Sequence, residues 1–204
     1  MNTFKPIEHI EELEVIYGEP RVTALAKVAD KLTPAYRKWI EASRICVLST
    51  VGPEGTDASP RGDDGPVVRI LGVKTLALPD WQGNNRMDSL RNIVRDGRAS
   101  LMFFVPGSRN VVRVNGQAVV TTDTEITDLF DRKGNKPRSV IILSVEEVYF
   151  QCSRALLRSG LWGAGDESAD LPTAGQMIAE MTDGAEGGPE YDASWNERAE
   201  KTLW

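Results

Sequence analysis

The sequence predicts a mostly β protein, an antiparallel sheet of the barrel type that is preceded by helices. Between residues 45 and 150 the chain alternates short apolar runs with Gly, Pro and Asp, a pattern typical of strands joined by tight turns. At least six such runs occur, and two helix-spaced segments interrupt them. The length of 204 residues allows one domain with a hydrophobic core and excludes two large ones.

Two helices are expected before the first strand. Residues 22–32 carry apolar side chains at helical spacing. Thr33 followed by Pro34 is typical of a helix start, because the Thr hydroxyl caps the helix and proline suits its first position. We therefore expect a second helix over residues 34–42, and we assign residues 1–42 as a helical extension of a single domain that covers residues 1–165.

The strands follow in order along the middle of the chain. The first is an apolar run that ends at Gly-Pro-Glu-Gly, and each later run is bounded by turn residues. The expected strands cover residues 45–51, 56–61, 67–71, 75–78, 99–105, 110–121 and 139–150.

A helix is expected between the fourth and fifth strands. Apolar residues recur on one helical face over residues 85–96, and either Asn84 or Asn85 can serve as its N-cap. A shorter helix is expected over residues 125–131, before the last strand.

The net charge of −6 is distributed unevenly. Residues 166–204 hold ten acids and two bases, whereas residues 1–165 hold 20 acids and 22 bases. Eight arginines fall within residues 61–113. Because the planar guanidinium suits bidentate contact with phosphate or carboxylate, these arginines favour a bound small anion.

Beyond residue 165 the composition changes to an acidic, Gly-rich tail. One amphipathic helix is expected over residues 174–181. The aromatic side chains Tyr191, Trp195 and Trp204 are too apolar to favour full solvation, so we expect this tail to pack on the barrel or on a partner subunit.

Composition also excludes several classes of function. No apolar run is long enough to cross a membrane, and no secretory signal opens the chain, so a cytoplasmic location is expected. Cys46 and Cys152 lie in apolar stretches and are expected to be buried free thiols. With His9 as the single histidine, no metal site is expected. Basic and aromatic residues are not interleaved as nucleic-acid binding requires.

Three segments are candidates for an anion-binding site. Arg61 and Gly62 belong to a Ser-Pro-Arg-Gly-Asp segment at a strand end, where glycine lets the backbone approach a ligand. Arg86 precedes a helix whose first backbone N–H groups favour phosphate. Arg113 lies inside a long strand and needs a carboxylate or a ligand as its partner, because an unpaired buried charge is costly.

In this order the segments resemble the pyridoxamine 5′-phosphate oxidase-like family of FMN-binding split β-barrels, in the branch marked by Ser-Pro-Arg-Gly-Asp. The resemblance spans roughly residues 36–162. Its markers are Asp-Ala-Ser-Pro-Arg-Gly-Asp at 57–63, Leu-Pro-Asp with Gly-Asn-Asn-Arg and Asp-Ser-Leu-Arg-Asn-Ile within 78–93, Val-Arg-Val-Asn-Gly at 112–116, and Ala-Leu-Leu-Arg-Ser-Gly-Leu-Trp at 155–162.

The resemblance implies a homodimer of six-stranded split barrels, with FMN at the interface and touched by both subunits. Arg61 and Arg86 match the residues that bind the phosphate, and Pro79 and Asp80 match those that line the isoalloxazine ring. Arg113 matches a strand near the flavin, while Arg158 and Trp162 approach the flavin or substrate from the other subunit. The cofactor-binding positions implied are Ser59, Arg61, Gly62, Pro79, Asp80, Asn85, Arg86, Ser89, Arg113, Arg158 and Trp162.

The function expected from the resemblance is an FMN-dependent oxidoreductase acting on a small molecule, with that substrate or NAD(P)H as reductant. Flavin carries the redox chemistry, so no catalytic side chain is assigned. The chain departs from the oxidase proper in two ways: no phosphate lysine is clear after Arg61, and no histidine-containing pattern follows Trp162. Vitamin B6 oxidation is therefore not expected, whereas FMN binding is.

Two alternatives share the same cofactor groove. One is a non-enzymatic flavin-binding or sensing module, which the sequence does not separate from an enzyme. The other is an F420-dependent reductase, whose polyglutamate tail calls for more bases at the groove mouth than FMN does. A haem-binding split barrel is disfavoured, because His9 lies outside the barrel region and haem needs an axial ligand.

Overall fold

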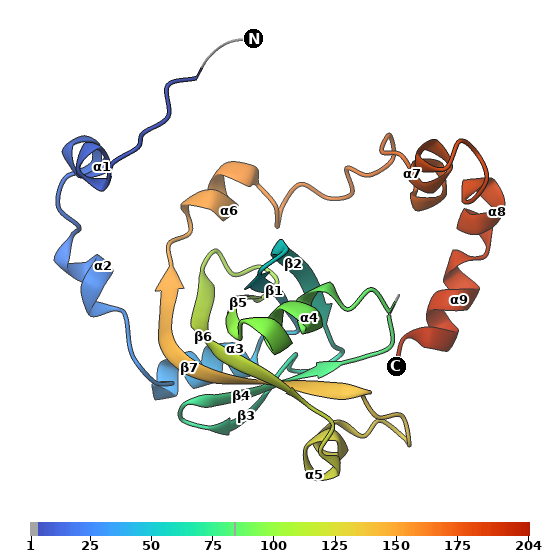
Figure 1. Ribbon diagram of the computed structural model, residues 1–204, viewed down its shortest axis with the longest axis horizontal. Helices are drawn as coiled ribbons and strands as arrows, with labels where there is room; N and C mark the ends of the chain where they lie inside the picture. The colour runs from blue at the N-terminus through green and yellow to red at the C-terminus, as the bar shows by residue number, and fades with distance from the viewer. Residues whose placement is uncertain (1–3, 84) are drawn as a thin grey trace.

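The computed structural model describes residues 4–83 and 85–204. Its centre is a seven-stranded antiparallel sheet in the order β2-β1-β5-β6-β7-β4-β3 (Figure 1). Each of the seven runs expected as a strand forms one, so the predicted mostly antiparallel sheet with helices is confirmed, with one strand more than the six implied. The strands are β1 Ile45–Gly52, β2 Gly55–Gly62, β3 Arg69–Gly72, β4 Thr75–Asp80, β5 Arg98–Phe104, β6 Val111–Thr121 and β7 Ser139–Gln151.

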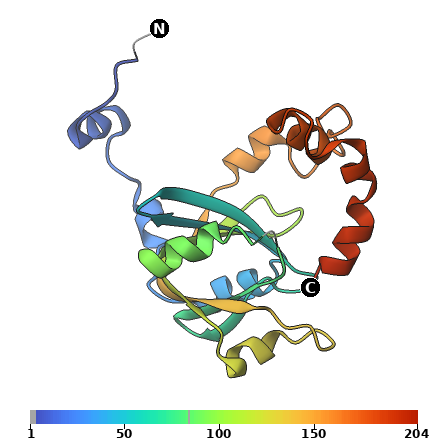
Figure 2. The ribbon, with the colours of Figure 1, turned by 45° about the vertical axis from the view of Figure 1, so that its right-hand side comes forward.

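The hydrophobic core collects alternate side chains from the central strands. Leu48, Leu101 and Val114 are at most 1% exposed, as the two-residue period of strands requires. Two helices cover this core, α3 (Pro34–Glu41) through the buried Ile40 and α4 (Asp88–Arg95) through the buried Ile93. Figure 2 shows α4 lying along β1 and β2, which brings the start of this helix to the sheet edge formed by β2.

The helices of the N-terminal extension differ from those that the sequence predicts. α1 (Ile10–Tyr17) was not expected, and α2 ends at Ala26 instead of continuing to residue 32 (α2, Val22–Ala26). The expected helix over residues 22–32 is wrong beyond Ala26 because tertiary hydrogen bonds replace helical ones. Ala29 pairs with Val148 of β7, and the backbone N–H of Leu32 donates to the Val73 carbonyl at 2.8 Å.

The predicted start of α3 is confirmed. Its N-cap is Thr33, whose hydroxyl accepts a hydrogen bond from the Tyr36 backbone N–H at 3.3 Å, and proline occupies the first turn. The short helix before β7 is split into α5 (Thr124–Thr127) and a 3-10 turn, η1 (Asp128–Phe130).

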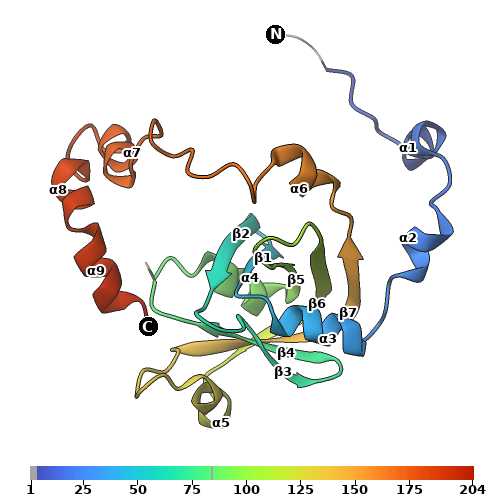
Figure 3. The same ribbon diagram turned by 180° about the vertical axis from the view of Figure 1, so that it is seen from behind.

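After β7 the chain forms a C-terminal arm, residues 154–204, that leaves the barrel and returns to it. Figures 1 and 3 show its last residues beside the loop that joins β4 to α4. The predicted helix over residues 174–181 is confirmed, and Thr173 and Gln176 form a capping box at its start. The arm consists of α6 Arg154–Ser159, α7 Ala174–Met181, α8 Gly188–Ala193 and α9 Trp195–Thr202.

The two cysteines lie in different environments. Cys46 is a buried free thiol, as predicted, whereas the prediction for Cys152 is wrong, since this free thiol is exposed. Cys152 follows the last residue of β7, where the strand has passed the edge of the core. In the described part of the chain, no helix combines the length and the apolar character needed to cross a bilayer.

Candidate binding pocket

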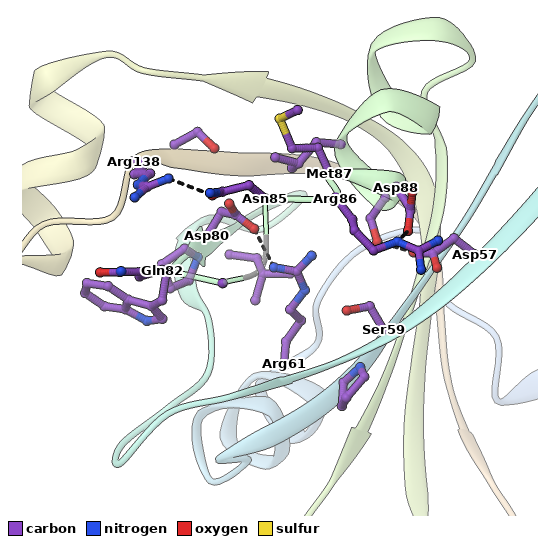
Figure 4. Close-up of a pocket in the computed structure, with 18 of the residues that line it drawn as sticks. Asp57, Ser59, Arg61, Asp80, Gln82, Asn85, Arg86, Met87, Asp88 and Arg138 are labelled. Carbon is purple, nitrogen blue, oxygen red and sulfur yellow. Dashed lines mark hydrogen bonds and ion pairs between the residues drawn. The ribbon is translucent and has the colours of Figure 1, made fainter. Parts of the chain in front are cut away.

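A pocket of about 660 Å³ opens where β2, the end of β4 and the start of α4 meet (Figure 4). This volume lies in the range of small-molecule sites. The turn residues 81–83 and 85–87, with Arg138 and the first residue of β7, Ser139, complete its wall.

Strand pairing sets which side chains of β2 serve the pocket. β2 pairs antiparallel with β1, and alternate residues of β2 oppose the buried residues of β1. These opposing pairs are Asp57 with Thr50, Ser59 with Leu48, and Arg61 with Cys46. Because side chains alternate between the faces of a sheet, Asp57, Ser59 and Arg61 share one face of β2. All three line the pocket.

Arg61 holds the end of β4 against β2. Its Nη1 donates to Asp80 Oδ1 at 2.5 Å, and both side chains are only 19% exposed (Figure 4). The Nε of Arg61 is buried and has no hydrogen-bond partner in the described part of the protein. A buried donor left in this state costs about 1–3 kcal/mol, so this nitrogen marks a place for an acceptor.

The loop before α4 presents a second arginine. Asn85 and Met87, on either side of Arg86, both have a φ of 61°, a left-handed conformation that is uncommon for residues other than glycine. Arg86 Nε lies 2.9 Å from Asp88 Oδ2, and its side chain is 73% exposed. This strain next to the pocket is typical of a binding loop.

The expected N-cap of α4 is wrong. The helix begins at Asp88 with Met87 as its N-cap, because left-handed residues at 85 and 87 cannot continue a right-handed helix toward the N-terminus. The Asn85 side chain has another contact, since its Oδ1 accepts a hydrogen bond from Arg138 Nη1 at 2.8 Å. The other expected cap, Asn84, lies outside the described residues.

Ser89 ties α4 to β2. Its side chain is buried and its hydroxyl donates to the Asp57 carboxylate. This bond joins α4 to a strand residue that lies 32 positions earlier in the chain, and Asp57 forms part of the pocket wall.

The charges around the pocket are balanced. Among the described residues, the lining holds three acids, Asp57, Asp80 and Asp88, and three bases, Arg61, Arg86 and Arg138. Two of the three arginines contact an aspartate of the lining. An anionic ligand can accept hydrogen bonds from the guanidinium N–H groups here. It competes for these donors with the carboxylates of the lining.

The structure gathers eight of the eleven predicted site residues and leaves three elsewhere. Those that line the pocket are Ser59, Arg61, Gly62, Pro79, Asp80, Asn85, Arg86 and Ser89. Arg113, Arg158 and Trp162 do not line it.

Arg113 projects from the half-exposed face of β6. Its Nη1 donates to Gln151 Oε1 at 3.3 Å, and its guanidinium lies 5.4 Å from the centre of the Tyr149 ring. Its Nε is buried and, among the described residues, has no partner. Trp162 donates from Nε1 to the Ser108 carbonyl at 2.6 Å, while Arg158 is exposed on α6.

Arg138 and Trp81 line the pocket but are not among the expected cofactor-binding positions. Arg138 reaches the pocket because β4 and β7 pair antiparallel, with Asp80 opposite Ser139, so the residue before β7 lies at the end of β4. No local pattern marks Arg138, and only the strand pairing reveals it. Trp81 directly follows Asp80, which was an expected site residue. Its position next to Asp80 in the sequence was the signal that could have placed it in the pocket.

Comparison with known proteins agrees with the predicted family. The family model described as pyridoxamine 5′-phosphate oxidase matches residues 32–152. A search of curated protein sequences gives no match.

Solved structures similar to this chain share little sequence with it. HupZ of Group A Streptococcus is 18% identical, with a TM-score of 0.49 over 60% of this chain and 95% of that one. A candidate pyridoxamine 5′-phosphate oxidase of Lactobacillus delbrueckii is 23% identical, with a TM-score of 0.47 over 59% and 95%. An F420 reductase is 17% identical, with a TM-score of 0.41 over 59% of this chain and 98% of that one.

Proposed function

Since the chain belongs to the pyridoxamine 5′-phosphate oxidase family, whose model matches more than half of it, we propose that its pocket binds FMN and that the protein is an FMN-dependent oxidoreductase acting on a small molecule. As the sequence suggests, we place it in the cytoplasm. The pocket between β2, β4 and α4 is the site of this proposal.

The buried Nε of Arg61 is the observation that carries the proposal. This nitrogen lies on a pocket residue at the position implied for phosphate binding, and it has no partner among the described residues. A guanidinium has five N–H donors, so Arg61 can keep its contact with Asp80 and still donate to a phosphate oxygen. The residues present therefore fit a phosphate-bearing cofactor.

The other lining residues supply the remaining needs of FMN. Arg86 and Arg138 add two more cations for a phosphate that carries about two negative charges. Val67 and Leu78, both buried, with Trp81, offer apolar surface for a flat ring system. When bound, FMN supplies electron transfer, while the chain binds, orients and shields it.

We propose further that the protein is a homodimer in which Arg113, Arg158 and Trp162 approach the partner's flavin. None of the three lines the pocket of its own chain. The Nε of Arg113 is buried and has no hydrogen-bond partner among the described residues. This supports an acceptor that comes from a second subunit or its cofactor. The same outer side of the sheet carries Ile45, which is 42% exposed and pairs in register with Phe104.

Cofactor binding is tested by the absorption spectrum of the purified protein and by FMN titration. We expect a yellow protein whose released chromophore is FMN. Arg61→Gln should raise the Kd for FMN about 10- to 100-fold, because it removes hydrogen bonds to a charged group. The matched control is Arg91→Gln, an exposed arginine of α4 that does not line the pocket, and it should bind like the wild type.

A colourless protein that takes up no added FMN would contradict the proposal, as would wild-type affinity in Arg61→Gln. Tighter binding of F420 than of FMN would favour the deazaflavin alternative. Anaerobic mixing of the FMN-loaded protein with NADPH or NADH, followed by admission of oxygen, tests turnover. A flavin that neither nucleotide nor any of a panel of small reductants reduces would favour a non-enzymatic module.

A further inference from the structure

We infer that residues 195–204 form a strap that closes the Trp81 side of the pocket and slows the exchange of its cofactor, with Trp204 as the anchor. The inference rests on the proposed function for the identity of that cofactor. The docking of the strap rests only on contacts within the protein.

Trp204 contacts a residue of the pocket wall. Its ring lies edge-on to that of Trp81, with centroids 5.2 Å apart and planes at 80°. Trp81 lines the pocket directly after Asp80. Edge-to-face pairs of this kind stabilise beyond the area that they bury. The end of the arm therefore lies on the outer side of the pocket wall.

A second contact holds Trp204 in place. The guanidinium of Arg132 lies 4.4 Å from the centre of the Trp204 ring, within the distance of a cation–π interaction. Arg132 is itself positioned, because it forms ion pairs with both Asp63 and Asp64. The strap thus docks on a cation that the barrel has already oriented.

Asp63 joins the two contacts into one cluster. Its side chain is 3% exposed, it pairs with Arg132, and its Oδ2 accepts a hydrogen bond from Trp81 Nε1 at 3.3 Å. We name Asp63, Trp81, Arg132 and Trp204 the Trp81 cluster. Three of its members belong to separate segments of the barrel region, and only Trp204 belongs to the arm, so only Trp204 is free to leave with the arm.

The rest of the strap is held weakly. In the described chain, α9 has no buried residue, and Trp195 is 53% exposed. Trp195 packs on Tyr191, within the arm itself, at a centroid distance of 6.4 Å. Docking therefore depends on the two ring contacts of Trp204. Each of these contacts is weak, so the strap can dissociate readily. Figures 1 and 3 place the arm's end beside the loop that joins β4 to α4, and this loop carries Arg86 of the pocket lining.

The first test needs no cofactor. Two coupled indoles give an exciton couplet in the circular dichroism of the apo protein. We expect the couplet in the wild type and its loss in Trp204→Ala. Trp195→Ala is the matched control, since it removes the other tryptophan of residues 195–204 and should keep the couplet. A wild type without a couplet, or a Trp204→Ala variant that keeps it, overturns the docking of the strap.

The second test measures the dissociation rate of FMN from the loaded protein after mixing with excess apoflavodoxin as a trap. We expect about a tenfold faster release from Trp204→Ala, the loss expected for one aromatic pair and one cation–π contact. The release rate of Trp204→Phe should lie between those of Trp204→Ala and the wild type. The release rate of Trp195→Ala should equal that of the wild type. Release at the wild-type rate from Trp204→Ala overturns the exchange role.

The two proposals fail in different ways. If no variant binds FMN, the proposed function and the exchange role are both wrong, while the couplet still decides whether the strap docks. If FMN binds and Arg61→Gln weakens it, but Trp204→Ala changes neither couplet nor rate, only the strap is wrong.

Discussion

At the scale of single residues, the two thiols show how burial controls reactivity. Cys46 is fully buried, and burial raises its pKa to about 12 from the ordinary 9.0, although the nearby Arg61 opposes the shift. Cys152 is exposed, and the backbone N–H of Arg154 lowers its pKa. Since the thiolate is the nucleophile, Cys152 is the reactive thiol of this chain.

Alkylation should separate the two cysteines. Iodoacetamide at pH 8 is expected to modify Cys152 in the folded protein and to leave Cys46 intact until the protein is unfolded in guanidinium. Peptide mass spectrometry reads both sites. Equal modification of the two thiols under native conditions would show that the region around Cys46 opens readily.

Cys46 should also make stability depend on pH in the alkaline range. Its folded pKa is raised, so the unfolded thiol ionises first, and the free energy of unfolding falls as pH rises from about 9 toward 12. Below pH 9 the contribution is fully present. Urea unfolding at pH 8, 9 and 10 checks this, and Cys46→Ala should show a smaller decline across that window than the wild type.

At the scale of elements, the pairing of β6 with β7 explains a glycine of the family marker. The register shifts between Asn115 and Gly116, and a Cβ added to Gly116 would lie 1.9 Å from the Ser144 carbonyl oxygen. The backbone of β7 occupies the space that any side chain at position 116 needs. Glycine is thus required there by packing between strands.

Gly116→Ala should therefore destabilise the protein, by about 1–3 kcal/mol, as overpacking of a well-packed site does. Gly72→Ala is the control, because its Cβ would meet nothing closer than the Thr75 side chain at 3.8 Å. Urea denaturation of both variants gives the comparison. Equal midpoints for the two variants would mean that the bulge relaxes to admit a methyl group.

At the scale of the whole molecule, the single chain leaves apolar surface that a partner can cover. The N-terminal helices α1 and α2 contain no buried residue, and Ile10, Ile16 and Tyr17 are all at least 64% exposed. On the sheet, Ile45 and Arg113 face outward from strands whose other face forms the core. This distribution suits a chain that functions as a pair.

The homodimer proposal predicts the effect of a charge on that sheet face. Wild-type protein should sediment as a dimer, and Ile45→Glu as a monomer with weaker FMN binding, because a buried unpaired carboxylate is costly. Val73→Glu alters an exposed valine in the turn between β3 and β4, and it should remain dimeric. A wild type that stays monomeric over a wide concentration range would contradict the proposal.

The sequence by itself determined which segments form the seven strands, where α3 begins and most of the pocket. Strands follow from local alternation and turn residues, and the α3 cap follows from Thr33 and Pro34, which act within one turn of the helix. Arg61, Asp80 and Arg86 were found because they stand in contiguous motifs at strand and helix ends. Such features depend on neighbours in the chain.

Only the tertiary structure decided the features that depend on contacts between distant segments. α2 stops early because Ala29 bonds to β7, and Arg138 enters the pocket because β7 pairs with β4. Trp204 meets Trp81 across most of the chain's length. These contacts have no local pattern, since the free energy that selects them comes from burial and pairing once the barrel has formed.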